Sequence, residues 1–429
     1  MSESIIENLP KNEVKITITV SVDELRPLLE KSAQDLSEET SIQGFRTGKA
    51  PYDVIKNKVG EMKIYEAALD SIVRKTYIEA VTTHELEIAG EPAIKVEKMA
   101  PKNDLIYTVV VSLMPKIEKL AEWKEMKVDA QPTEVSDKDV ELSLKGLAKM
   151  QTKETRKTKE RSAEKEDKVV IDMNIKKDGV PIEGGQAINN AVFLSEDHYI
   201  PGFCDQLMGL KEGDKKNFIL KFPNTHYQKH LADQDVEFDI VVKEIYRLEE
   251  AELNDQFATV LGMKDLATLK DALRQNMIHE AEHKEKLRQE RAMLDMIASK
   301  TNFGEISDSL INEEINKMIH ELEHSVENQG GVFDDYLKSI NKTLGDLKLD
   351  FTPEALLRIK VALVIREIAQ AEKINVEESE VDQELDSLAE KYQDTEAKKN
   401  IYSPANREYI SIMIKNRKVI DLLRQTMIK

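Results

Sequence analysis

The chain contains little cysteine, few aromatic residues and no long apolar run, and each absence excludes a class of protein. A single cysteine, Cys204, among 429 residues rules out an intrachain disulfide and is typical of reducing compartments. No apolar stretch approaches the roughly 20 residues of a membrane-spanning helix. Residues 1–8 lack the basic and apolar segments of a secretory signal. We therefore expect a cytoplasmic protein with no membrane contact.

Positive charge is also scarce, because 62 Lys and Arg residues face 81 Asp and Glu residues, for a formal net charge of −19. A surface this acidic argues against general nucleic-acid binding, and we expect no binding to DNA. Any contact with RNA must be local. Charged residues make up 33% of the chain and aromatic residues 5%, which at this length favours several soluble, well-hydrated domains with small cores.

The most informative segment is the basic loop Gly44–Pro51, with the sequence Gly-Phe-Arg-Thr-Gly-Lys-Ala-Pro. Gly44 and Gly48 permit a tight turn, and Pro51 stiffens its exit. Over residues 46–63 five cations stand against two acids, a local charge of +3 in an acidic chain. A nucleotide-binding P-loop is excluded, since it needs four residues between its glycines and Ser or Thr after the lysine. A docking site for phosphate and an ordinary solvated turn are the two interpretations.

This octapeptide resembles the ribosome-docking signature of the trigger factor family, bacterial chaperones that sit at the exit of the ribosomal tunnel. In that family a Gly-Phe-Arg-x-Gly-x-x-Pro loop joins two helices of the N-terminal domain, and Thr47 stands where a lysine is usual. The resemblance implies that the partner is the large ribosomal subunit, both protein and ribosomal RNA at the tunnel exit. The residues that it assigns to ribosome binding are Gly44, Phe45, Arg46, Gly48, Lys49 and Pro51.

The pattern around the loop predicts an α+β domain over residues 1–115. Residues 13–21 alternate with period two, as a half-buried strand does. Ser21, followed by two acidic residues, is typical of a helix N-cap. Apolar residues at helical spacing from Ile55 to Ile72 predict one more helix after the loop, and later apolar stretches complete a small sheet.

Residues 116–165 are predicted to form a connector. Ser136 is a helix N-cap, and Val140 and Leu144 follow on one face of the expected helix. That helix runs into a basic stretch from Lys153 to Arg161 without apolar periodicity, which we interpret as a solvated linker.

Short strand patterns dominate residues 166–247, with hairpin signals such as Lys177-Asp178-Gly179. Ile-Pro-Gly-Phe at 200–203, followed by Gly-Leu-Lys-Glu-Gly-Asp at 209–214, resembles the FKBP-type peptidyl-prolyl isomerases in order and spacing. The resemblance implies an antiparallel β domain with a short helix, in the middle of the chain as in trigger factor.

Such a domain favours the twisted prolyl bond in a dry aromatic bowl, against a barrier of ~18–20 kcal/mol. The residues that match the pocket are Ile200, Phe203, Tyr227 and Phe238, with Glu183 at an acidic position beside it. Met173, Ile182 and Asn190 stand where aromatic residues are usual, which predicts weak activity at most. Whether the domain is an active enzyme is left open, since these residues equally suit the plain core of a small β domain.

Residues 248–429 are predicted to be all-α, with helical arms. The segment 251–258 resembles the start of the trigger factor C-terminal domain, and Thr352-Pro353 is typical of a helix N-terminus. The chain has 15 methionines, whose adaptable side chains suit a surface that accepts many sequences. The predicted client-binding residues are Ile315, Met318, Ile319, Leu322 and Phe333.

The pattern His-Glu-x-x-His occurs twice, at 279–283 and 320–324. On a helix it places two imidazoles on one face, as a zinc site requires. Chance matches are easy in helices this rich in glutamate, and a metalloprotease also needs a third ligand and a buried helix. We expect no metal site and no cofactor, with weak adventitious metal binding as the alternative.

The resemblances follow the domain order of trigger factor along essentially the whole chain. They imply an ATP-independent chaperone that docks at the ribosome and holds nascent and unfolded polypeptides, with a homodimer as one expected form off the ribosome. The competing class is a free-standing FKBP-type isomerase whose helical parts recruit substrate. A helical scaffold carrying an inactive isomerase fold is the third.

Overall fold

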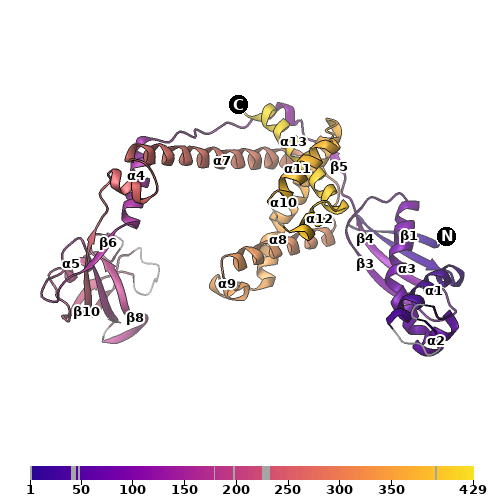
Figure 1. The fold of residues 1–429 in the computed structure, drawn as a ribbon, viewed down its shortest axis with the longest axis horizontal. Helices are drawn as coiled ribbons and strands as arrows, with labels where there is room; N and C mark the ends of the chain where they lie inside the picture. Colours follow the sequence, from indigo (N-terminus) through magenta and orange to yellow (C-terminus); the bar gives the residue numbers. More distant parts are fainter. Residues whose placement is uncertain are drawn as a thin grey trace. The chain divides into compact units, whose positions relative to one another are not determined.

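The computed structural model (Figure 1) describes residues 2–39, 45–46, 49–177, 179–196, 199–224, 232–391 and 394–429. The chain forms two compact units. The first consists of Met1–Gln131 with Lys286–Lys429, and the second of Pro132–Glu285. Each unit has cores of its own.

An antiparallel sheet with the strand order β1-β2-β4-β3 opens the first unit. Its strands are β1 (Glu3–Leu9), β2 (Glu13–Val20), β3 (Ile88–Lys98) and β4 (Leu105–Leu113). The helices that share its core are α1 (Val22–Glu39), α2 (Tyr52–Val59) and α3 (Glu61–Thr83). Every second residue of β2 is buried, and Ile16 and Ile18 lie in one core with Leu25 of α1 and Ile72 of α3. The predicted α+β fold of this region and its strand over residues 13–21 are confirmed.

The single helix predicted after the basic loop is in fact two helices. Gly60, at φ +92°, ends α2 and begins α3, because a positive φ cannot continue an α-helix. An ion pair of 2.9 Å joins Lys56 Nζ to Glu61 Oε1 across the break. Strand β1 was not predicted either, since its apolar residues Ile5 and Ile6 are adjacent and give no alternation.

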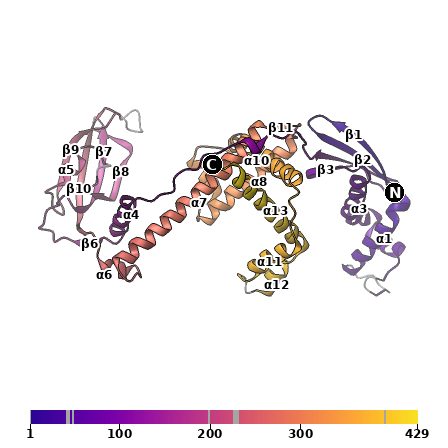
Figure 2. The same ribbon diagram turned by 90° about the horizontal axis from the view of Figure 1, so that it is seen from above.

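Helices form the rest of the first unit, together with a small two-stranded pairing. The elements are β5 (Ile117–Lys119), the 3₁₀ turn η1 (Trp123–Glu125), β11 (Asn302–Phe303), α8 (Asp308–Asn328), α9 (Phe333–Ser339), α10 (Leu344–Ala371), α11 (Glu378–Ala389), α12 (Thr395–Ile401) and α13 (Pro404–Met427). Trp123 packs with Ile297, Val364 and Val419 in the main helical core. Figure 2 shows α11 beside α13, where Leu385 meets Ile410 in a smaller core. The predicted all-α C-terminal region is confirmed, apart from the short strand β11.

Helix α10 starts earlier than the sequence predicts. Thr343 is its N-cap and forms a capping box with Asp346, so that Pro353 lies inside the helix and does not begin it. The capping box of Thr343 and Asp346 satisfies backbone N–H groups at the helix start, a full two turns before the proline. It is a stronger start signal than Thr352-Pro353, so the helix begins at this box.

The second unit combines a helical cluster with a five-stranded antiparallel sheet. Its helices are α4 (Asp137–Met150), α5 (Phe203–Leu207), α6 (Asp255–Val260) and the first part of α7 (Leu266–Lys300), which continues into the first unit. Its strands are β6 (Lys153–Arg156), β7 (Asp167–Lys177), β8 (Val180–Phe193), β9 (Lys215–Lys221) and β10 (Asp235–Glu249). The order is β6-β10-β7-β8, and β9 also pairs with β10. The predicted helix start at Ser136 is confirmed by a capping box with Asp139.

The basic stretch after α4 is not the solvated linker that we predicted. Residues Lys153–Arg156 form β6 and pair with Tyr246–Glu249 of β10. Lys157 follows, and its side chain is only 6% exposed. The linker prediction is wrong for this segment, because a run of charged residues in the sequence does not reveal that the fold places buried carboxylates next to it.

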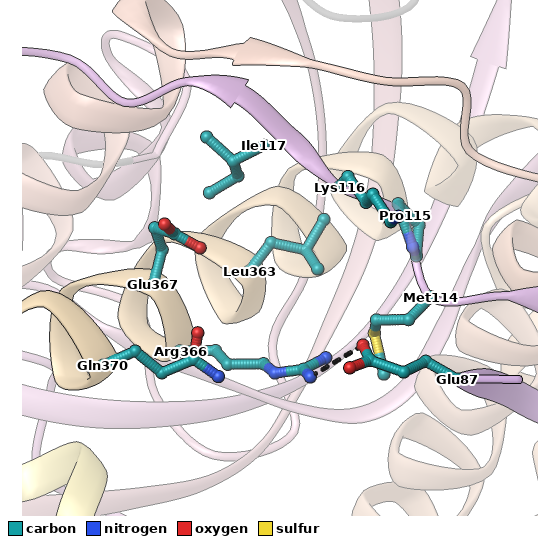
Figure 3. Close-up of a pocket in the computed structure, with 9 residues that line it drawn as sticks. All are labelled: Glu87, Met114, Pro115, Lys116, Ile117, Leu363, Arg366, Glu367 and Gln370. Carbon is teal, nitrogen blue, oxygen red and sulfur yellow. Dashed lines mark hydrogen bonds and ion pairs between the residues drawn. The ribbon is translucent and has the colours of Figure 1, made fainter. Parts of the chain in front are cut away.

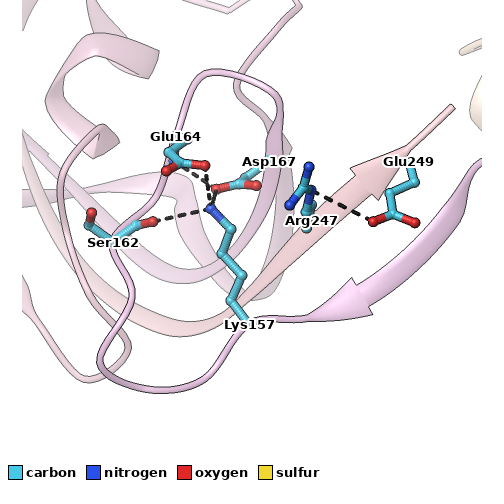
Figure 4. A network of polar contacts seen from close by, with 6 residues as sticks. All are labelled: Lys157, Ser162, Glu164, Asp167, Arg247 and Glu249. Atoms are coloured by element: carbon cyan, nitrogen blue, oxygen red, sulfur yellow. Dashed lines mark hydrogen bonds and ion pairs between the residues drawn. The ribbon is translucent and has the colours of Figure 1, made fainter.

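A buried ion pair fixes this segment to the sheet (Figure 4). Lys157 Nζ lies 2.7 Å from Asp167 Oδ2, whose side chain is 2% exposed, and 2.8 Å from Glu164 Oε2. It also donates to the carbonyl of Ser162 at 3.4 Å. The Glu164 N–H donates to Asp167 Oδ2 at 2.7 Å, so the carboxylate keeps two donors. Burial acts to lower the pKa of Lys157, but the hydrogen bonds to Asp167 and Glu164 outweigh it and raise this pKa above its usual value.

Within the first unit, a serine cluster joins the sheet to the start of α8. Ser112 of β4 and Ser307, the N-cap of α8, are both buried, and their hydroxyls lie 2.7 Å apart. Ser309 bonds to Ser112 as well, and donates to Glu13 Oε1 of β2 at 2.8 Å. The residues Ser112, Ser307, Ser309 and Glu13 are called the serine seam below.

Candidate functional site

The basic loop presents a ring and two cations to solvent just before α2. Phe45 is 44% exposed, and Arg46 and Lys49 are exposed as well. The Lys49 N–H donates to the Arg46 carbonyl at 2.9 Å. Ala50 is buried against the sheet's core, and Pro51 is the N-cap of α2, so the loop's exit is anchored. Gly44 and Gly48 lie outside the described residues.

Not all of the cations that follow the loop in the sequence are free to bind an anion. Lys56 pairs with Glu61, and this hydrogen bond raises the pKa of Lys56. Lys58 and Lys63 are exposed, like the two loop cations. The surface that can meet an anion therefore includes Arg46 and Lys49 at the loop.

The sheet of strands β6 to β10 is called the isomerase-like sheet below. Several of its predicted pocket residues pack in one aromatic cluster. The Phe203 ring centroid lies 5.4 Å from that of Phe238 and 5.8 Å from that of Phe218. Phe218 and Phe222 both stack on Phe238, at 5.4 and 6.3 Å. Ile200 packs half-buried against this cluster. All four phenylalanines are buried, so these rings form the core of the cluster.

The rest of the predicted pocket is described in part. Tyr227 lies outside the described residues, as does the side chain of Glu183. Met173 and Ile182 pack half-buried on the aromatic cluster. The assignment of these residues to catalysis stays a prediction.

Sequence reasoning missed two rings of the cluster. Phe218 and Leu220 of β9 and Phe222 just after it occupy every second position, and this period-two pattern could have identified the two rings. Tyr199 was also missed; its ring lies 6.2 Å from that of Phe203, and its hydroxyl accepts from the Phe193 N–H at 3.1 Å. Burial raises the pKa of Tyr199, so its hydroxyl is neutral at physiological pH.

The predicted client-binding residues fall into two groups. Ile315 and Met318 are 3% and 7% exposed, because they pack against Ala355 of α10. Ile319 and Leu322 of α8 are half-buried. Phe333 of α9 is half-buried too, and its ring stacks on Tyr336 at 6.4 Å. The client prediction stays a prediction, and it is better supported for the second group.

The region from α9 to the start of α10 also exposes apolar residues outside the predicted client-binding set. Leu349 is 74% exposed, Val332 61% and Leu344 45%. In the sequence these residues resemble core positions of helices, because exposure depends on which neighbour a helix face receives.

The first unit also contains a hollow of about 250 Å³ (Figure 3). Met114, Pro115, Ile117 and Leu363 supply its apolar wall. At its rim the guanidinium of Arg366 on α10 lies 3.0 Å from Glu87 Oε2, just before β3. The ion pair links the strand region to α10 on the side of the hollow.

Comparisons with known proteins cover the whole chain. The family described as bacterial trigger factor protein (TF) matches residues 1–147, and its C-terminal model matches residues 265–425. The trigger factor of Carboxydothermus hydrogenoformans is 32% identical over 423 residues, which is 97% of each chain. That of Halalkalibacterium halodurans is 30% identical over 425 residues, again 97% of each. The chain belongs to the trigger factor family.

Trigger factor is a ribosome-associated chaperone, and this member carries an FKBP-type domain. A model described as FKBP-type peptidyl-prolyl cis-trans isomerase matches residues 159–243, the part of the chain with the aromatic cluster. A solved structure described as "Promiscuous Substrate Recognition in Folding and Assembly Activities of the Trigger Factor Chaperone" aligns over 99% of each chain, with a TM-score of 0.46 and 22% identity. The family binds ribosomes and nascent or unfolded chains.

The described residues show neither a membrane-spanning helix nor a metal cluster. Among them, no helix is long and apolar enough to cross a membrane. The described residues also contain no group of three or more His, Cys, Asp or Glu arranged to hold a metal ion. Both His-Glu-x-x-His segments lie on exposed stretches of α7 and α8, unlike the buried helix of a metalloprotease.

Proposed function

We propose that the chain docks at the exit of the ribosomal tunnel through Phe45, Arg46 and Lys49, and contacts both protein and RNA of the large subunit. The observation that carries this proposal is the exposed ring beside two exposed cations, on a loop anchored by buried Ala50. The two cations can bind RNA phosphates, and the aromatic ring can stack on an unpaired base or pack on a protein surface. The net charge of −19 keeps the remaining surface from binding RNA unspecifically.

Co-sedimentation with bacterial ribosomes in a salt series tests the docking site. Replacing Phe45, Arg46 and Lys49 together with alanine should abolish binding at moderate salt. The thermal midpoint should hardly change, because exposed loop residues contribute little to stability.

A matched control lies on α3 of the same domain. Ile78 is 56% exposed, and Arg74 and Lys75 are exposed beside it, so their triple alanine variant loses the same charge and one exposed apolar side chain. This control should bind ribosomes like the wild type. Unaltered binding by the loop variant, or equal loss in both variants, would remove the loop from the docking site.

For clients, we propose the arm built from α8, α9 and the start of α10. Ile319, Leu322 and Phe333 are its half-buried members, and Val332 and Leu349 are its exposed ones. Unfolded chains offer apolar side chains in any order, and a broad apolar surface binds them by burial at about 25 cal/mol per Å². The acidic surface elsewhere keeps the chaperone soluble.

Suppression of aggregation of a refolding protein tests the client surface. The double variant Val332→Ser/Leu349→Ser should suppress aggregation less well than the wild type. Its control is Leu142→Ser/Met150→Ser on α4, where the side chains are 71% and 81% exposed. Equal effects of the two variants would show that general surface hydrophobicity, and not this arm, holds clients.

A weak prolyl isomerase is the second candidate function, supported by the FKBP-type match and the aromatic cluster. We propose that activity on a proline peptide is low, because Met173, Ile182 and Asn190 replace rings. Asn190 lies opposite Ile171 on β7 and is half-buried, so Asn190→Phe should raise the rate if the ring enters without overpacking. A wild-type rate equal to that of a single-domain FKBP-type enzyme would overturn this.

A deletion separates chaperone from enzyme. Residues 152–250 contain all five strands of the isomerase-like sheet, and the flanking Gln151 and Ala251 line one hollow, so a short Gly-Ser linker can join them. The deleted chain should still suppress aggregation. Loss of suppression in a folded deletion variant would favour the isomerase or the inactive scaffold.

Localisation and assembly complete the proposal. We propose that the protein is cytoplasmic, in keeping with its one cysteine, and that it forms a homodimer off the ribosome. Light scattering over a concentration series should show a mass that rises from one chain towards two. A constant single-chain mass at all concentrations would contradict the dimer.

A further inference from the structure

Helix α8 carries two histidines one turn apart, His320 and His324. Their ring centroids lie 4.5 Å apart, with the planes at 63°. Both side chains are exposed, at 69% and 61%, whereas Ile315 and Met318 of the same helix are buried. The two imidazoles thus share a solvent-facing side of α8, separate from the side that packs on α10.

Each imidazole has a carboxylate next to one of its nitrogens. His320 Nδ1 lies 3.6 Å from Glu323 Oε2, and His324 Nδ1 lies 3.6 Å from Glu327 Oε2. The two carboxylates place negative charge beside the rings, which favours a cation bound to the imidazole pair. Carboxylates outside the coordination shell are common neighbours of metal-binding histidines.

The other carboxylate within the pattern is engaged elsewhere. Glu321 Oε2 accepts from Arg358 of α10 at 3.0 Å. Since the described residues offer no group of three or more ligands, water must complete the coordination of any ion held here. Such a site is open and exposed, which excludes both a structural zinc site of four protein ligands and a buried protease centre.

We propose that His320 and His324 together bind one divalent transition-metal ion on the exposed side of α8. Imidazole nitrogen suits Cu²⁺, Ni²⁺ and Zn²⁺, whereas Mg²⁺ and Ca²⁺ prefer oxygen. The order of affinities should place Cu²⁺ above Ni²⁺ and above Zn²⁺. Because both ligands belong to adjacent turns of one helix, the bound ion stabilises this stretch of α8 by mass action.

Calorimetric titration of the full chain with CuCl₂, NiCl₂, ZnCl₂ and MgCl₂, each alone, tests the site. The wild type should bind Cu²⁺ and Ni²⁺, and His320→Gln/His324→Gln should lose one metal equivalent. The control is His279→Gln/His283→Gln, which has the same sequence spacing on α7 and should keep that equivalent. A third variant, Glu323→Gln/Glu327→Gln, should bind about 10- to 100-fold more weakly, because it keeps both ligands and loses their outer partners.

Three results would overturn the proposal. They are the absence of binding heat with all three transition metals, an unchanged stoichiometry in His320→Gln/His324→Gln, and loss of the same equivalent in the α7 control. The substituted side chains are exposed, and unchanged helical circular dichroism will verify that each variant is folded. The titration does not involve ribosomes or clients, so its outcome is independent of the proposed chaperone function.

Discussion

Replacing Lys157 with methionine should destabilise the isomerase-like sheet of this trigger factor without affecting the helical body. Methionine keeps much of the apolar stem and removes the ammonium that pairs with Asp167. Breaking a buried ion pair by removing one partner typically costs about 3–5 kcal/mol. Asp167 retains the N–H of Glu164 at 2.7 Å, so we expect the lower end, about 3 kcal/mol. That energy corresponds to roughly a hundredfold change in the opening equilibrium.

Amide hydrogen exchange is the suitable assay, because it resolves each part of a multidomain chain. The amides of Ile171 and Val242, paired across β7 and β10, should exchange on the order of 100-fold faster in the variant. The single tryptophan, Trp123, lies in the helical core of the first unit, and its fluorescence transition in urea should stay unchanged.

Lys159→Met is the matched control for this experiment. Lys159 pairs with Glu212 at 3.4 Å, but its side chain is 80% exposed, so the variant should change stability by no more than about 0.5 kcal/mol. Exchange in Lys157→Met that rises less than about threefold, or a shifted Trp123 transition, would refute the assignment of the buried pair as the anchor of this segment.

The pair also sets a pH dependence with a definite sign. The pKa of Lys157 is raised in the folded chain, so its stabilising contribution is complete below the ordinary lysine pKa of about 10.4 and is lost as pH rises through the folded value. Wild-type protection of the sheet should therefore fall in alkali, and Lys157→Met should show less of this fall. Identical alkaline profiles would contradict the linkage.

Further predictions concern the other cores and the basic loop. Burial raises the pKa of Tyr107 to about 12, so the N-terminal domain should lose stability between pH ~10 and 12. Subtracting the absorbance titration of Tyr107→Phe from that of the wild type should show one phenol that ionises only above pH ~10. Phe203→Ala removes a ring from a buried cluster and should destabilise the isomerase-like sheet by about 3–5 kcal/mol. A loss of isomerase activity in this variant therefore indicates a catalytic role only if amide hydrogen exchange shows that the domain is still folded. Arg46→Ala alone should reduce the slope of log affinity for ribosomes against log salt by about 1, and an unchanged slope would exclude a phosphate contact.

The sequence predicts those parts of the fold in which local pattern and burial agree. Strand β2 alternates because one face lies on the core, and α4 begins at a capping box that is visible in the letters Ser136 to Asp139. The errors arise where a distant partner decides. Strand β6 exists because β10 offers a free edge after β9, and α10 extends through Pro353 because Thr343 caps it earlier.

The sites show the same division. A loop motif with glycine, aromatic and basic residues can be recognised in the sequence, because the exposure of its side chains does not depend on a tertiary contact. Whether Ile315 and Met318 face clients or core cannot be read from their spacing, since α10 supplies the cover through Ala355. Likewise, the four rings of the aromatic cluster come from α5, β9, the segment just after β9, and β10, and only the fold brings them together.

The serine seam restricts how this protein can be recombined. Ser112 and Ser307 are 195 positions apart and share a buried hydrogen bond, so an N-terminal domain transplanted from a relative would bring only one of the two. A buried hydroxyl left without its partner costs about 1–3 kcal/mol. The N-terminal domain is therefore interchangeable only together with the first turn of α8, and substitutions at these positions should occur in pairs across the family.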